Sequence, residues 1–518
     1  SNRISGAGGL NIGSGGTGVL TLADAQTMLY ATGGGTHFVG QNAGSVGTVV
    51  VSNGLLNLTG FLTVGDAGRG TLALDGGTNI ISSSVTIGSL AGSEGVVNMA
   101  GAGVSMVVTG GVNMGTSAGS MGYLNVSNGL LSIGGASAWG NAGRALVTLN
   151  GGSITGAFVA SLPRGAGTGT LVMASTDSSF YSGGVLAPYG AGGRSEVYLS
   201  NGYMNADSMQ LGFGNSSYGY ISVNNSTVDF RRTGGTALSI GGNYDGTTQN
   251  STGLVVIADE RAFIRVGHQI TGTGIGTAVG VGSNSMGMLI ISNGTFDSKG
   301  LNVGQSAYSR GEVLVEDGLL IVHTNAFTVA NGVGSVGTLT LAHPGSLLEN
   351  HVGTDSLKIG GGLGSQGSLY LSNGLAVLRQ LLIGEAGYGY VEVGPARLII
   401  SNNLYIPNAV AAGTGTGRMV IASAQALVTV TQTLSRVGSG QAGNTGAYGE
   451  LIVSNGTFQS QALEVGGVSA GMLHIGAATV TVFSTGGNGL KIGHGAGTGR
   501  VVLAHSGALL DIPGAELW

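Results

Sequence analysis

The chain has 518 residues, including 105 Gly, and pairs 8% charged with 42% apolar residues, a balance opposite to that of disordered chains. Only six Pro and no Gly at every third position exclude a collagen triple helix, and the absence of Cys excludes disulfides and thiolate metal sites. A net charge of −5 without a basic block argues against nucleic-acid binding, and the lack of any run of about 18 apolar residues predicts no transmembrane helix.

One cassette recurs along the whole chain. Each copy opens with a short run of alternating apolar residues, and the residue that begins the run is usually Gly. The copies start about 27 residues apart, with spacers of variable length, as expected when insertions fall in loops. Because a repeat array grows in one dimension, the sequence predicts one continuous body over residues 1–518. The 19 predicted starts are Gly18, Gly47, Gly70, Gly95, Gly122, Ala145, Gly169, Ser195, Gly219, Gly253, Gly287, Gly311, Gly337, Gly367, Gly389, Gly417, Gly449, Gly471 and Gly499.

The first element of each unit is a half-buried strand, as where Leu369 and Leu371 flank Tyr370. A corner follows, most often Ser-Asn-Gly, and Asn and Gly accept a left-handed backbone at low cost, which predicts a sharp bend. An Asn-Gly pair could also mark a hairpin, but the next run does not match the first in length or polarity. These corners lie at Asn53, Asn128, Asn201, Asn293, Asn373 and Asn455.

The last element of the unit reads apolar-x-apolar-Gly with a polar middle residue. This pattern predicts a short strand whose flanking residues face the core and whose middle residue faces solvent. It occurs at residues 10–13, 62–65, 85–88, 112–115, 238–241, 301–304, 357–360, 463–466 and 490–493.

Three short strands per unit, joined by Gly-rich bends, predict an all-β fold: a single three-sided parallel β-helix of about 19 turns. The alternative, a sandwich of antiparallel hairpins, would give regular short turn signals without a period of about 27 residues. One turn alone buries too little apolar surface to offset the entropy of ordering its residues, so the turns must stabilise one another by stacking. No segment keeps a helical period, and we expect no helix.

Three longer spacers, at residues 241–252, 271–285 and 438–446, are predicted to be surface loops, where solenoids often carry binding sites. The first contains GGNYDG at 241–246, one imperfect copy of the calcium-binding nonapeptide repeat. A single copy is weak support for calcium, and we predict no cofactor.

Catalytic candidates are few. A polysaccharide-cleaving β-helix needs carboxylates gathered from adjacent turns, and pairs such as Glu312 and Glu316 have no such support. The His residues show neither H-x-H nor H-E-x-x-H spacing, so we interpret each as a lone surface or corner residue. We therefore predict no catalytic site, no metal site and no enzyme. The eight His are His37, His268, His323, His343, His351, His474, His494 and His505.

The cassette G-x-L-x-[LV]-S-N-G followed by L-x-[VI]-G, as in residues 367–384 and 449–466, resembles the Gly-rich β-strand repeats of autotransporter passenger domains and related secreted bacterial surface proteins. The resemblance implies a right-handed β-helix outside a Gram-negative-type cell. It also implies a signal peptide and a C-terminal anchor in the precursor.

Both ends of the chain carry repeat-like segments. Ser1-Asn2-Arg3 stands where a Ser-Asn-Gly corner would be, and residues 515–518 take the place of a third strand. No polar capping segment covers these segments, so we expect the ends to stack head to tail. The residues expected to take part are Ser1, Asn2, Ile4, Leu10, Leu509, Ile512, Leu517 and Trp518.

The function predicted from the sequence is structural: a secreted β-helical subunit that joins copies of itself into a fibre or sheath. The alternative is a surface adhesin of the autotransporter type that binds glycan or host matrix, with extracellular polysaccharide as the partner. A carbohydrate-active enzyme is the least favoured of the three.

Overall fold

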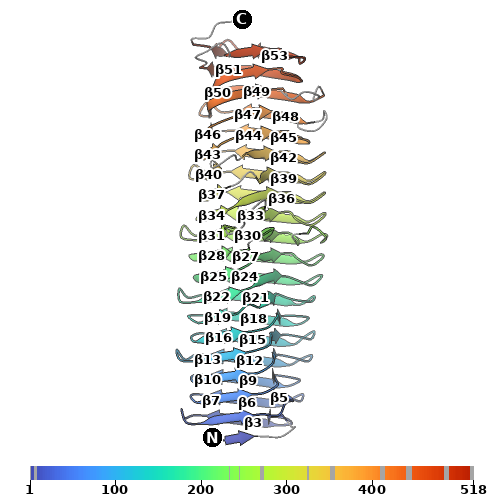
Figure 1. Cartoon of the computed structure of the whole chain (residues 1–518), viewed down its shortest axis with the longest axis vertical. Coiled ribbons are helices and arrows are strands. Elements are labelled where there is room, and N and C mark those ends of the chain that lie inside the picture. Colours follow the sequence, from blue (N-terminus) through green and yellow to red (C-terminus); the bar gives the residue numbers. More distant parts are fainter. Residues whose placement is uncertain are drawn as a thin grey trace.

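The structure is a computed structural model that describes residues 2–4, 9–232, 234–243, 245–268, 274–323, 326–350, 356–408, 415–438, 446–483 and 489–513, with residues 2–4 and 433 described by their backbone alone. These residues form 54 strands in one sheet and no helix. Over most of the chain each strand pairs in parallel with the strand three places further along, so three strands complete a turn (Figure 1). The predicted all-β parallel β-solenoid is confirmed, with about 18 turns. Its right-handed winding and three-sided cross-section stay predictions.

The turns stack into three columns of strands. The first column holds β3 (Thr17–Leu22), β6 (Val46–Val51), β9 (Arg69–Leu74), β12 (Glu94–Met99), β15 (Met121–Val126), β18 (Arg144–Leu149), β21 (Thr168–Met173), β24 (Arg194–Leu199), β27 (Tyr218–Val223), β30 (Thr252–Ile257), β33 (Met286–Ile291), β36 (Arg310–Val315), β39 (Val336–Leu341), β42 (Gln366–Leu371), β45 (Tyr388–Val393), β48 (Thr416–Ile421) and β53 (Gly499–Leu503). The second holds β1 (Asn2–Ile4), β4 (Met28–Ala31), β7 (Leu55–Leu58), β10 (Thr78–Ile81), β13 (Ser105–Val108), β16 (Leu130–Ile133), β19 (Ser153–Thr155), β22 (Ser179–Ser182), β25 (Gly202–Ala206), β28 (Ser226–Phe230), β31 (Phe263–Val266), β34 (Thr295–Ser298), β37 (Leu319–Val322), β40 (Leu347–Asn350), β43 (Leu375–Leu378), β46 (Arg397–Ile400) and β54 (Leu509–Asp511). The third holds β2 (Asn11–Ile12), β5 (Thr36–Val39), β8 (Phe61–Val64), β11 (Val85–Ile87), β14 (Val112–Met114), β17 (Ser137–Trp139), β20 (Val159–Ser161), β23 (Gly184–Ala187), β26 (Met209–Leu211), β29 (Thr236–Ile240), β32 (Gly276–Val279), β35 (Gly300–Val303), β38 (Phe327–Val329), β41 (Leu357–Ile359), β44 (Leu381–Ile383), β47 (Leu404–Ile406) and β52 (Leu490–Ile492).

Near the C-terminal end the strands fuse across the corners. β49 (Leu427–Val437) runs through the second and third columns, β50 (Tyr448–Val465) through all three, and β51 (Ala470–Val482) through the first and second. The corner predicted at Asn455 therefore lies inside a continuous strand.

All 19 predicted repeat starts lie at one position of the first column. Gly18 pairs with Gly47, Gly47 with Gly70, and the register continues unbroken through Ala145 and Ser195 to Gly499. A slip of one residue would turn every core side chain to the outside, so the alternating pattern fixes this register.

The core is a continuous column of apolar side chains. In the first column Leu369 and Leu371 are buried while Tyr370 between them is half-buried, as the alternation predicts. The Gly of the Ser-Asn-Gly corner takes a positive φ, for example 82° at Gly374. The closing Gly of the third element does the same: Gly384 has φ 74°, and a Cβ there would collide with the carbonyl oxygen of Thr416 in the next turn.

The third column is more covered than predicted. The middle residues Thr63, Ser239, Asn302 and Glu464, expected to face solvent, are all buried. Neighbouring turns cover this face. At Thr328, another buried middle residue, a Cβ on Gly361 one turn away would lie 2.7 Å from Cγ2, and Glu464 is paired with Arg436 of the preceding turn at 3.1 Å. The expectation of solvent exposure is wrong at these positions.

Two predicted irregular segments also differ in the structure. Residues 271–285, expected to be a loop, contain the third-column strand β32, whose Thr277 takes a core position usually held by an apolar residue. Asn2, expected at a corner, lies in strand β1 and pairs with Leu29. In residues 241–252 the side chains of Asn243, Thr248 and Ser251 are buried; most of residues 438–446 lies outside the described residues.

Candidate functional site

The described residues among those predicted to mediate self-association lie at the two ends of the rod (Figure 1). Ser1, Leu517 and Trp518 fall outside the described residues, and Asn2 and Ile4 are known by their backbone, which forms β1. Leu10 and Ile512 are partly buried and pack against the core. Leu509 in β54 is exposed.

The last described turn also exposes core positions that sequence reasoning missed. Ile492 pairs with Val465, and Leu503 pairs with Ile475, one turn earlier. Val465 and Ile475 are 0% exposed, whereas Ile492 is 52% and Leu503 54% exposed. Their place in the repeat is the only sequence signal that would have found them.

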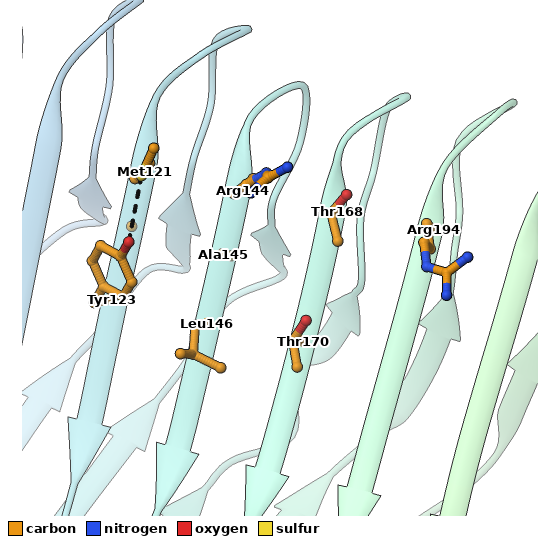
Figure 2. A pocket seen from close by; sticks show the side chains of 9 residues that line it. Met121, Tyr123, Arg144, Ala145, Leu146, Thr168, Thr170 and Arg194 are labelled. Atoms are coloured by element: carbon orange, nitrogen blue, oxygen red, sulfur yellow. Dashed lines mark hydrogen bonds between the residues drawn. The ribbon is translucent and has the colours of Figure 1, made fainter.

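An open groove of about 380 Å³ lies on the outer face of the first column, over β15, β18, β21 and β24 (Figure 2). Tyr123 and Leu146 form its apolar floor, and the hydroxyl of Tyr123 contacts Sδ of Met121 at 3.4 Å. Thr168 and Thr170 add hydroxyl groups from the next strand, as Figure 2 shows. A second hollow of about 210 Å³ shares Met121, Arg144 and Thr168 and continues around the corner.

Two arginines border this groove but differ in their partners. Arg194 is held by Glu196 at 2.8 Å and stacks over Tyr218, 4.6 Å from the ring centroid. Arg144 is exposed and, within the part of the chain that the structure describes, lies in no ion pair. The groove therefore offers one uncommitted cation beside an aromatic ring and hydroxyl groups.

A polar network covers the outer face of the second column. Asn205, Asp229, Arg265 and Asp297 occupy successive turns at one register position. Asp229 accepts a hydrogen bond from the Tyr203 hydroxyl at 2.7 Å and pairs with Arg265 at 3.2 Å. Burial and the hydrogen bond to Asp229 raise the pKa of Tyr203. A pocket of about 250 Å³ is lined by Tyr203, Asn205, Asp229 and Arg265 and reaches His268.

Beyond this pocket, His268, Asp297 and His323 meet from three consecutive turns. Asp297 lies in β34, while His268 follows β31 and His323 follows β37, so stacking brings both rings to one carboxylate. Each Nε2 lies within hydrogen-bonding distance of Oδ1 of Asp297, at 2.9 Å for His268 and 2.7 Å for His323. Partial burial alone would raise the pKa of Asp297, but the hydrogen bonds and charges of the two His residues hold that pKa below its ordinary value.

The expectation that every His is a lone surface or corner residue is wrong for four of them, because each has a partner from a neighbouring turn. His37 is buried, and its Nδ1 accepts a hydrogen bond from the Leu10 amide N–H at 3.0 Å. Its Nε2 lies 3.2 Å from the carbonyl oxygen of Thr59. His343 lies 3.2 Å from Asp317. His268 and His323 share Asp297, as described above. No local motif could reveal these pairs, because the partners stand one repeat apart in the sequence.

No known family model matches this chain, and no curated protein matches it either. Within the described residues there is also no helix that could cross a membrane.

Proposed function

We propose that the protein is structural: an extracellular β-helical rod that joins copies of itself head to tail into a fibre or sheath. The observation that carries the proposal is the exposure of the core positions Ile492 and Leu503, whose partners one turn earlier are fully buried. Exposed core residues and unpaired strand edges together form a template on which another turn of the same repeat can pair.

A first turn from a second copy offers a suitable surface. Leu10, Ile12 and Leu20 at the other end are partly buried residues that pack against the core. Ile12 holds the repeat position of Ile492, and Leu20 that of Val501. Burying a Leu or Ile contributes about 1.5–3 kcal/mol, so several such residues, together with new backbone hydrogen bonds, can offset the cost of association.

The test is to place a charge at the exposed core position of β53. Replacing Leu503 with Glu should abolish growth in length, because a carboxylate cannot be buried against an incoming turn without a partner. Negative-stain electron microscopy and sedimentation velocity across a concentration series would measure particle length. A single copy should be a rod of roughly 90 Å, from about 4.8 Å per strand.

Val502 provides the matched control, because it neighbours Leu503 in β53 and pairs with the outward-facing His474. Val502→Glu should leave the length distribution of the parent protein unchanged. Rods of single-copy length at every concentration of the parent protein would refute head-to-tail assembly.

A second candidate function is supported by the groove of Figure 2: binding of an acidic polysaccharide, as a surface adhesin would. Arg144 has no ion-pair partner among the described residues, and a uronic acid carboxylate could supply one. The ring of Tyr123 offers a flat surface for stacking against a sugar. The groove spans four successive turns, so a polymer lying along the rod could contact all of them.

If the groove binds such a polymer, Arg144→Ser should weaken binding of alginate roughly tenfold at low salt, the loss expected for one charged hydrogen bond. Arg164→Ser makes the same charge change at an exposed residue outside the groove and should have little effect. Affinity electrophoresis with alginate, and with uncharged dextran as reference, would measure the difference. Equal losses for the two variants would exclude a specific role for the groove.

A further inference from the structure

We propose that His268, Asp297 and His323 form a binding site for a divalent transition metal, with Zn²⁺ as the best-fitting ion. The three side chains offer two imidazole nitrogens and one carboxylate oxygen, and these atoms all lie within 4.8 Å of one another. They come from three consecutive turns, so the site exists only because the solenoid stacks.

The spacing of the ligand atoms suits a small ion after a minor adjustment. A tetrahedral Zn²⁺ has bonds of about 2.0–2.1 Å to His, which places its ligand atoms about 3.3 Å apart. The present Nε2–Oδ1 distances are 2.9 and 2.7 Å, so each ring must move back by about half an ångström. Both His side chains are about one-third exposed, which leaves them room for that movement.

The donor set selects the class of metal. Imidazole suits Zn²⁺, Cu²⁺ and Ni²⁺, whereas Ca²⁺ and Mg²⁺ prefer oxygen donors throughout. A tetrahedral ion with three protein ligands has a fourth position for water. Solvent can reach that position, because His268 and His323 are both partly exposed. To bind the ion, each ring must present a lone pair at Nε2, so its proton moves to Nδ1 or to solvent.

The positive charge nearest to the site, on Arg265, is paired with a carboxylate. Arg265 occupies the register position next to Asp297 and would repel a cation if its charge were free. It is instead paired with Asp229 at 3.2 Å and lies over the ring of Phe263, 5.3 Å from the centroid. Asp229 is in turn held by Tyr203, so the guanidinium is drawn toward the neighbouring turn.

A bound ion would join β31, β34 and β37 through side chains. This cross-link would add to the backbone ladder a contact that the unfolded chain lacks. Binding should therefore raise the thermal stability of the rod in a concentration-dependent way.

The experiment is a titration of tag-free, chelator-treated protein with ZnCl₂ by isothermal calorimetry, together with Co²⁺ absorption spectra to report on geometry. We expect the parent protein to bind one Zn²⁺ per chain. His323→Asn and Asp297→Asn should each bind Zn²⁺ at least tenfold more weakly than the parent protein does. The parent should also show a higher melting temperature with Zn²⁺ that EDTA reverses. Mg²⁺ at millimolar concentration should not compete.

His343→Asn is the matched control, because His343 forms a similar pair with Asp317 but has no third ligand among the described residues. It should retain the affinity of the parent protein. Circular dichroism without metal would confirm that each variant keeps the parent fold. The proposal is overturned if the parent binds no Zn²⁺, or if His323→Asn and Asp297→Asn bind it as tightly as His343→Asn does.

Discussion

Replacing Phe180 with Ala should be among the most destabilising single truncations in this protein, with an expected loss of about 3–5 kcal/mol. Phe180 lies in the core with Trp139 and Phe158, and all three side chains are almost fully buried. Phe180 meets both of the other rings edge to face, with centroids 6.0 Å apart in each pair. Removing it deletes two aromatic contacts and leaves a cavity that rigid neighbouring turns cannot close.

The effect should be local, because each turn of a solenoid contacts only its neighbours. Native-state hydrogen exchange should show faster opening in β19, β22 and β25, and thermal unfolding should begin earlier. Tyr181→Ala is the control, since Tyr181 is adjacent in β22 but faces outward and is exposed. A similar loss in both variants would contradict the assignment of Phe180 to the core.

The repeat was readable from the sequence because one physical constraint acts at every turn. A side chain that points into the core must usually be apolar, whereas one that points outward need not be. The alternation around Leu369 and Leu371 therefore marks both the strand and its register. The positive φ at Gly374 explains why the corner keeps its Gly. Fold and register therefore follow from short segments taken one at a time.

The candidate sites could not be predicted in this way, because each consists of residues from different turns. His268 and Asp297 stand 29 residues apart, and Asp297 and His323 stand 26 apart, so no contiguous motif joins them. These separations are close to the repeat length, but the strand register pairs Asp297 with Arg265 and Ile321. The two His residues reach Asp297 only from positions just after β31 and β37, which the repeat pattern does not place. The exposure of the third column also depends on neighbouring turns, which is why the burial of Ser239 and Asn302 was not predicted.

Polar residues inside the core show that the column tolerates exceptions when their hydrogen bonds are met. Thr277 and Ser298 face each other from different columns at 2.9 Å, and Ser435 and Ser460 repeat that arrangement at 2.7 Å. Ser298 and Ser460 each donate in addition to a backbone carbonyl two residues ahead. A buried charge without such hydrogen-bond partners would destabilise its turn. In a one-dimensional stack, the loss of one turn also separates the turns on its two sides.

Replacing Leu341 with Asp should split the rod into two parts that unfold separately. Leu341 is fully buried in β39 between Val315 and Leu371 of the adjacent turns. Keeping an unpaired carboxyl group protonated there at pH 7 costs about 4 kcal/mol, and the lost burial of Leu adds about 2 kcal/mol. Because a turn is stabilised only by its two neighbours, loss of this turn should uncouple the turns before it from those after it.

The measurement is limited proteolysis with thermolysin followed by mass spectrometry. Leu341→Asp should give two resistant fragments with cleavage concentrated around β39, and its melting curve should resolve into two transitions. Thr340→Asp carries the same charge one residue away on the outward face, so it should stay intact and melt as the parent protein does. An Asp at 341 that leaves the rod resistant to protease would mean that stability is shared over many turns, and the nearest-neighbour account of this solenoid would then fail.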